Sequence, residues 1–114
     1  MIDQTKKLVQ ALKSLQIPVA YYTFPENDAP KLPYIVYWQE SDNTLFCDNT
    51  AYGYSGNYTL ELYYDRKNTE LENRIKKEVS DNGFIISRGA DVYIPTEKMF
   101  MLTFDVSYKN VSIN

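Results

Sequence analysis

Residues 99–108 read MFMLTFDVSY, and apolar and polar side chains alternate along this stretch more clearly than anywhere else in the chain. Its even-numbered residues are all apolar or aromatic, whereas the odd-numbered ones include Thr103, Asp105 and Ser107. Side chains alternate across a β-strand, so this pattern predicts a strand with one buried face. Residues 58–64, YTLELYY, repeat the alternation and predict a second long strand within 52–64.

Two segments have helical spacing instead. Apolar residues recur at helical intervals from Leu8 to Leu15, which predicts an amphipathic helix that ends before Pro18. Thr69 and Glu72 stand three residues apart, like a capping box, ahead of an apolar stripe at 71, 75 and 79. We expect this second helix to run to about Asn82 and to end on a left-handed glycine at position 83.

Shorter strands and loops fill the remainder. We expect strands at 19–24 and 34–38, the second of them ended by the polar run 41–44, and a loop or short edge strand at 45–47. Residues 84–86 and 92–94 resemble a hairpin that turns at 88–91. Two helices and several strands joined by short connections predict an α+β fold, in which a mainly antiparallel sheet carries both helices on one face. A length of 114 residues suits a single domain over residues 1–114.

Composition excludes several functions. The net charge of -3 disfavours sequence-independent electrostatic binding to nucleic acid or to an anionic membrane. We also expect neither a membrane span nor a signal peptide, because no apolar run is long enough. Histidine is absent, which removes the commonest general base and metal ligand. Cys47 is the only cysteine, and Asp48 beside it would raise the thiol pKa. We therefore expect no catalytic residues, no cofactor, no metal and no enzymatic activity.

Contact surfaces are the remaining candidates for a functional site. The loops at 25–33 and 41–49 are rich in polar and structure-breaking residues, a composition found in binding loops and also in plain solvated connections. A tyrosine cluster within 52–64 favours core packing and a protein interface over base stacking, since it lacks interleaved lysine and arginine. The candidate interface residues are Phe24, Glu26, Asp28, Asp42, Asn43, Leu45, Phe46, Tyr52 and Tyr54.

Several stretches in a fixed order resemble a known family. They are 17–21 (IPVAY), 24–26 (FPE), 33–37 (PYIVY), 41–43 (SDN), 58–63 (YTLELY), 65–67 (DRK) before 69–72 (TELE), and 104–108 (FDVSY). Together they cover roughly residues 8 to 108, and the chain resembles the tail terminator proteins, also called tail completion or minor tail proteins, of siphophages and prophages of Gram-positive bacteria.

The resemblance implies a structural role without catalytic residues. It implies a homo-oligomeric ring, expected to be a hexamer, that caps the tail tube, ends tail polymerisation and provides the head-tail joining surface. The implied partners are the tail tube protein and the head connector protein, with DNA passing through the ring, no sequence-specific nucleic-acid binding and no membrane. The implied location is the head-proximal end of the virion tail, after assembly in the host cytoplasm.

Two alternatives stay open at the level of sequence. A head-tail connector or head-closure protein has the same size and ring-forming behaviour, and affinity for the portal instead of the tail tube would identify it. A single-stranded nucleic-acid binding module would use the tyrosines, and a salt-sensitive shift of a labelled oligonucleotide would identify that function.

Overall fold

The computed structural model describes residues 4–24, 29–47 and 50–111, with side chains described outside 41–55 and 109–111. Two helices and five strands follow one another along the chain: α1 (Gln4–Lys13), β1 (Val19–Tyr21), β2 (Tyr34–Cys47), β3 (Thr50–Tyr64), α2 (Thr69–Asp81), β4 (Ile85–Ile94) and β5 (Met99–Val111).

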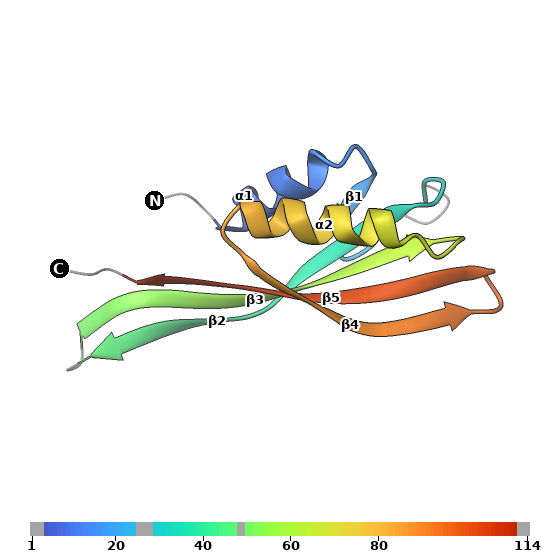
Figure 1. Ribbon diagram of the computed structural model, residues 1–114. Helices are drawn as coiled ribbons and strands as arrows, with labels where there is room; N and C mark the ends of the chain where they lie inside the picture. Colours follow the sequence, from blue (N-terminus) through green and yellow to red (C-terminus); the bar gives the residue numbers. More distant parts are fainter. Residues whose placement is uncertain (1–3, 25–28, 48–49, 112–114) are drawn as a thin grey trace.

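The five strands form one sheet in the order β1-β2-β3-β5-β4, and both helices lie on the same side of it (Figure 1). The pairs β2–β3, β3–β5 and β4–β5 are antiparallel, whereas the short β1 runs parallel to β2. Strand β5 is inserted between β3 and β4, so α2 connects two strands that are not neighbours. The predicted α+β fold, with a mostly antiparallel sheet under two helices, is confirmed.

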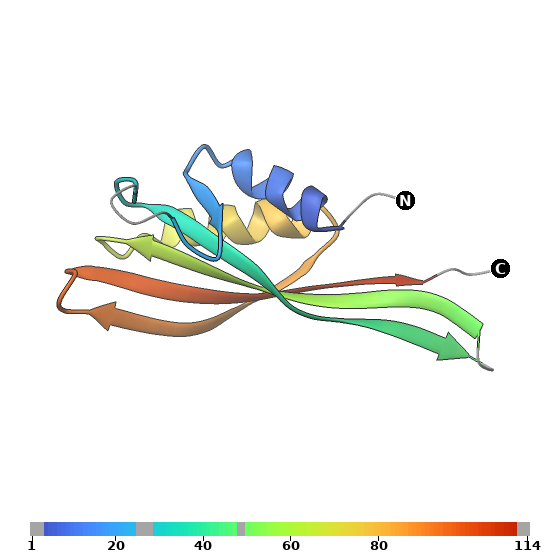
Figure 2. The same cartoon turned by 180° about the vertical axis from the view of Figure 1, so that it is seen from behind.

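The core lies between the helices and the sheet, where the predicted alternation puts it. The even-numbered residues of 58–64 in β3 are almost fully buried, as are Leu102, Phe104 and Val106 in β5. Leu8 and Leu12 of α1 and Ile75 and Val79 of α2 close the core from the helix side. The remaining face of the sheet carries no helix (Figure 2).

Strand β2 is longer than the sequence predicts. It continues through the polar run 41–44 to Cys47 and pairs with β3 as far as Thr50, so the predicted loop at 41–49 is wrong for residues 41–47. The ends of β2, β3 and β5 nearest the chain termini extend past the helix layer (Figures 1 and 2). We call these extended strand ends the arm. Backbone pairing between β2 and β3 stabilises the arm. Because no helix covers it, its strands do not need apolar residues at alternate positions.

Strand β4 is also continuous, and the predicted hairpin turn at 88–91 is wrong. The pairing register with β5 shifts between Arg88 and Asp91, so this segment forms a β-bulge within one strand. The chain turns instead at 95–98, between β4 and β5. An extra residue in the bulge brings Arg88 and Asp91, three residues apart, to the same face of the sheet.

The start of α2 differs from the predicted capping box by one residue. Asn68 is the N-cap, and its side chain accepts a hydrogen bond from the Leu71 backbone N–H at 3.0 Å. Thr69 is already inside the helix, and Glu72 turns into the structure instead of back to the cap. The predicted helix end is confirmed, because Asn82 is the C-cap and Gly83 has φ +90°.

The predicted strand at 19–24 ends earlier, at Tyr21. Tyr22 has a φ of 68°, in the left-handed region that bulky residues rarely adopt, so the extended strand conformation stops there. In the part of the chain that the structure describes, neither helix has the length and apolar character needed to span a bilayer.

Candidate interaction surface on the open face of the sheet

The helix-free face of the sheet, which we call the open face, carries aromatic and acidic side chains. The strand register places Tyr34, Tyr63 and Met101 in one row across it, and Trp38, Thr59 and Asp105 in another. Glu61 lies between the two rows on β3. On the strands β2, β3, β4 and β5 themselves, all charged side chains that the structure describes on this face are carboxylates.

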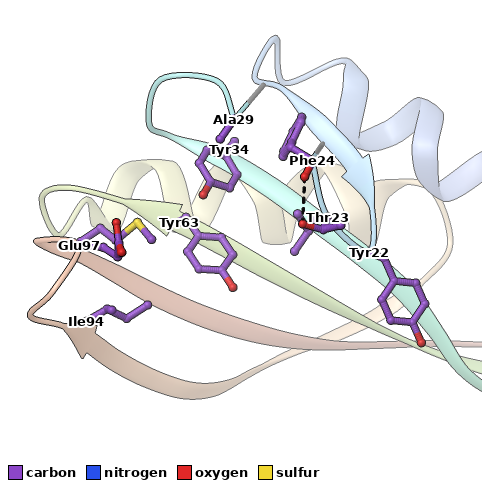
Figure 3. A pocket seen from close by; sticks show the side chains of 10 residues that line it. Tyr22, Thr23, Phe24, Ala29, Tyr34, Tyr63, Ile94 and Glu97 are labelled. Atoms are coloured by element: carbon purple, nitrogen blue, oxygen red, sulfur yellow. Dashed lines mark hydrogen bonds between the residues drawn. The ribbon is translucent and has the colours of Figure 1, made fainter. Parts of the chain in front are cut away.

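One end of the open face is hollowed into a cavity of about 450 Å³, which we call the aromatic pocket. Figure 3 shows Tyr34 and Tyr63 in its middle, between Glu97 on one side and Phe24 and Tyr22 on the other. The loop after β1, the strands β2 and β3, and the turn before β5 all contribute to it. Its lining residues are Tyr22, Thr23, Phe24, Ala29, Tyr34, Val36, Tyr63, Ile94, Glu97 and Met99.

Ring contacts hold the aromatic residues of the pocket in place. Tyr34 and Tyr63 stack with ring centroids 5.2 Å apart, and Phe24 meets Tyr34 edge to face at 5.1 Å. Tyr22 stacks on Trp38 at 5.7 Å, with the ring planes 18° apart. Such pairs are worth about 0.5–1.5 kcal/mol beyond their burial. The pocket wall is therefore preformed.

The electrostatic environment of the pocket is negative. Burial raises the pKa of Tyr34, and the nearby charge of Glu97 raises it further. Burial also raises the pKa of Tyr63, whose hydroxyl donates a 3.0 Å hydrogen bond to Glu61 Oε1. Among the described residues, neither a lysine nor an arginine lines the cavity. Both tyrosines thus stay neutral at physiological pH, and the charge of the pocket comes from carboxylates.

Glu40, farther along the open face, is held by two donors from different strands. Its Oε1 accepts hydrogen bonds from the Trp38 indole N–H at 2.5 Å and from the Thr59 hydroxyl at 2.9 Å. A second hollow, of about 230 Å³, is lined by Glu40 and Asp105 among others. Both carboxylates are exposed, so they do not form the buried acid pair that would point to acid-base catalysis.

A separate polar cluster lies on the helix side, beneath the start of α2. Glu72 is 7% exposed there, and its carboxylate faces Lys67 Nζ at 3.5 Å and Arg88 Nη2 at 3.3 Å. Asp91 binds the same two cations at 2.8 and 3.0 Å. Two acids are balanced by two bases, so we assign this cluster to folding and not to ligand binding.

The described residues offer little for catalysis or metal binding. Among them, no group of three or more acidic, cysteine or histidine side chains is arranged to hold a metal ion. The sequence contains no histidine to act as a base. Stacked aromatic rings, an apolar wall and a few carboxylates are instead suited to binding.

The structure separates the interface residues predicted from sequence. Phe24 lines the aromatic pocket, whereas Glu26 and Asp28 lie outside the described residues. The others belong to the arm and not to a loop: Asp42, Asn43, Leu45 and Phe46 lie in β2, and Tyr52 and Tyr54 lie in β3. The side chains of these six residues are outside the described part.

The tyrosine cluster is divided between the two faces of the sheet. Tyr58 and Tyr64 are buried on the helix side, whereas Tyr63 lies on the open face. Alternation along 58–64 puts Tyr63 on the face opposite the core, but sequence reasoning missed Tyr34, Tyr22 and Glu97 as residues that line the same pocket. For Tyr34, the only local signal in the sequence is the alternation along 34–38, which predicts the face of the strand on which it lies. The pocket itself cannot be predicted locally, because it depends on the register between strands and on a turn.

The large hydrophobic residues that remain exposed lie at opposite edges of the sheet. Tyr21 and Tyr22, at and just after the end of β1, are 55% and 60% exposed. Ile85, Val92 and Tyr93 on β4 are 69%, 44% and 49% exposed. Because β1 and β4 are the outermost strands, these residues lie along two different edges of the sheet, which we call the β1 edge and the β4 edge.

Comparison with known proteins does not identify a function for this surface. Its aromatic pocket, its carboxylates and its two apolar edges therefore have to carry the functional argument by their own chemistry. Comparison of the chain with protein-family models found no matching family, and comparison with curated proteins found no matching sequence.

Proposed function

We propose that the chain is a non-enzymatic tail terminator subunit of a long-tailed bacteriophage or prophage. In this role it assembles into a closed ring on the end of the tail tube, stops tube growth and offers a joining surface to the head. The observation that carries the proposal is the presence of exposed large hydrophobic side chains along both opposite edges of one sheet. The family resemblance in the ordered sequence pattern supports it.

Two different patches on one subunit favour a ring over a simple dimer. A two-fold dimer joins a patch to its own copy, whereas a head-to-tail contact joins one patch to a different one and forms a ring when the rotation between successive subunits closes. Both β1 and β4 are edge strands of the sheet, and edge strands in general present backbone groups that favour edge-to-edge contact. We expect six subunits in the ring, as the resemblance implies.

The acidic open face favours a role in which DNA passes through the ring without being bound by the subunits. A surface that holds phosphate needs clustered lysine and arginine, and the described charges on this face are carboxylates. The same feature opposes the alternative of a single-stranded nucleic-acid binding module, as does the burial of Tyr58 and Tyr64.

The first test is the mass of the purified protein by light scattering over a range of concentrations, with and without isolated tail tubes, followed by electron microscopy. A ring, free or on tube ends, is expected. Ile85→Asp should abolish it because a charge replaces the most exposed apolar side chain of the β4 edge. Asn73→Asp, on the exposed surface of α2, is the matched control and should leave it intact.

A mixing experiment tests the head-to-tail arrangement itself. Tyr21→Asp damages the β1 edge and Ile85→Asp damages the β4 edge, so each variant alone should be monomeric. Their mixture retains one intact pair of edges and should form a species of two subunits that does not grow further. A monomer under all conditions, including with tail tubes, would contradict the proposed function.

A further inference from the structure

We propose that the aromatic pocket binds a cationic side chain, preferentially the guanidinium group of an arginine presented by a partner protein. The argument rests on the lining of the pocket and on its charge, and it does not depend on ring assembly. The pocket would therefore be an anchor point for a basic segment of the partner.

The lining matches the two chemical parts of such a side chain. Tyr34, Tyr63 and Phe24 supply aromatic rings, which attract cations through the negative charge of the ring face. Val36 and Ile94 supply aliphatic wall against which the methylene stem of an arginine can pack. The volume of about 450 Å³ lies within the range of ligand-binding cavities.

The charge of the pocket is complementary to a cation. Glu97 lines it, and among the described residues this carboxylate has no ion-pair partner. Glu61 lies next to the pocket and accepts the Tyr63 hydroxyl hydrogen bond. An anionic ligand would meet these carboxylates without a compensating lysine or arginine in the lining, and a neutral ligand would leave the charge of Glu97 unused.

Arginine is favoured over lysine by shape. A planar guanidinium stacks on an aromatic ring and offers paired donors to both oxygens of a carboxylate, whereas an ammonium group is a more strongly hydrated point charge. The rings and the carboxylate of this pocket provide both kinds of partner on neighbouring elements (Figure 3).

The test uses capped tripeptides with a central arginine, lysine or citrulline between glycines, titrated into the full-length protein and followed by NMR of the tyrosine rings. Citrulline has the shape of arginine without the charge. The arginine peptide should shift the Tyr34 and Tyr63 ring signals and bind about fivefold or more tightly than the citrulline peptide, as expected for loss of a cation–aromatic contact. The lysine peptide should lie between them.

Variants assign the effect to the pocket. Glu97→Gln should weaken binding of the arginine peptide by about fivefold, since it removes the charge partner of the guanidinium. Glu70→Gln, an exposed carboxylate on α2, is the control and should leave binding unchanged. Equal binding of arginine and citrulline peptides by the unmodified protein would overturn the proposal. Stronger shifts of the same rings by an oligothymidylate would overturn it in favour of base stacking.

Discussion

The Tyr64 hydroxyl donates a 2.7 Å hydrogen bond to Glu72 Oε2 beneath the first turn of α2. This contact joins the central strand β3 to the helix that covers it, and Lys67 Nζ donates to the same tyrosine oxygen. A carboxylate that is 7% exposed depends on such donors, because burial of a charge is costly unless the charge is paired and hydrogen-bonded.

Tyr64→Phe should therefore lower the free energy of unfolding by about 2 kcal/mol, as expected for loss of a buried hydrogen bond to a charged group. Urea denaturation measures the change. Tyr93→Phe is the matched control because Tyr93 is half exposed, and it should change stability by less than about 0.5 kcal/mol. Equal effects of the two substitutions would contradict a structural role for the Tyr64–Glu72 contact.

The position of the α2 cap gives a second prediction. Asn68→Ala should cost about 1 kcal/mol because it leaves the Leu71 backbone N–H without its side-chain acceptor. Thr69→Ala should change stability by less than about 0.5 kcal/mol, since Thr69 is exposed and does not cap the helix. Thermal or urea denaturation of the two variants distinguishes them, and the reverse ranking would restore the capping box predicted from sequence.

Gly56 in β3 is required by the aromatic ring opposite it. A Cβ atom at this position would lie 2.6 Å from Tyr108 Cε1, and Tyr108 itself packs against Tyr58 and Phe84. Gly56→Ala should destabilise the protein by about 1–3 kcal/mol through this overpacking. Without the clash the substitution would instead stabilise the strand by about 0.5 kcal/mol, because glycine is the more flexible residue.

A double-mutant cycle in urea attributes that cost to the tyrosine ring. In a Tyr108→Leu background, Gly56→Ala should cost at least about 0.5 kcal/mol less than it does in the original protein. Strict additivity of the two substitutions would mean that the clash lies elsewhere.

Alkaline pH should destabilise the fold. Burial raises the pKa of Tyr63 and Tyr64 above the ordinary value of 10.0, so the folded state keeps these protons where the unfolded chain loses them. A raised folded-state pKa gives stability that is fully present below pH 10 and is lost as pH rises above it. The free energy of unfolding should therefore fall from about pH 10 upward.

Tyr63→Phe should make this decline shallower, by at most about 1.4 kcal/mol per pH unit, because it removes one of the groups with a raised pKa. Urea unfolding at a series of pH values measures the slope, which is compared between the two proteins independently of their difference at neutral pH. Identical slopes would contradict the assignment.

Local pattern was enough to predict the parts of the fold that repeat over a few residues. Alternation in 58–64 and 99–108 identified β3, β5 and their buried faces, and helical spacing identified α1 and α2. The polar run at 41–44 misled the prediction, because pairing with β3 decides its structure and its own composition does not. Similarly, the Gly89 segment forms a bulge because β5 holds both sides of it in one strand.

The candidate site was less accessible from the sequence. Phe24 was predicted as a contact residue and lines the aromatic pocket, but its partners come from positions 34, 63 and 97. Tyr34 meets Tyr63 only through the register of β2 on β3, and Glu97 reaches the pocket only because the chain turns at 95–98. These relationships are set by long-range pairing, which a local pattern does not encode.

The insertion of β5 between β3 and β4 also constrains the order of events during synthesis. Strand β4 leaves the ribosome before β5 but has no neighbour in the sheet until residues 99–111 are available. Strand β3 can form its hairpin with β2 early, yet its other side stays open over the same interval. The subunit therefore completes its core and its β4 edge in one late step, and until then the unpaired side of β3 is exposed to contact with other chains.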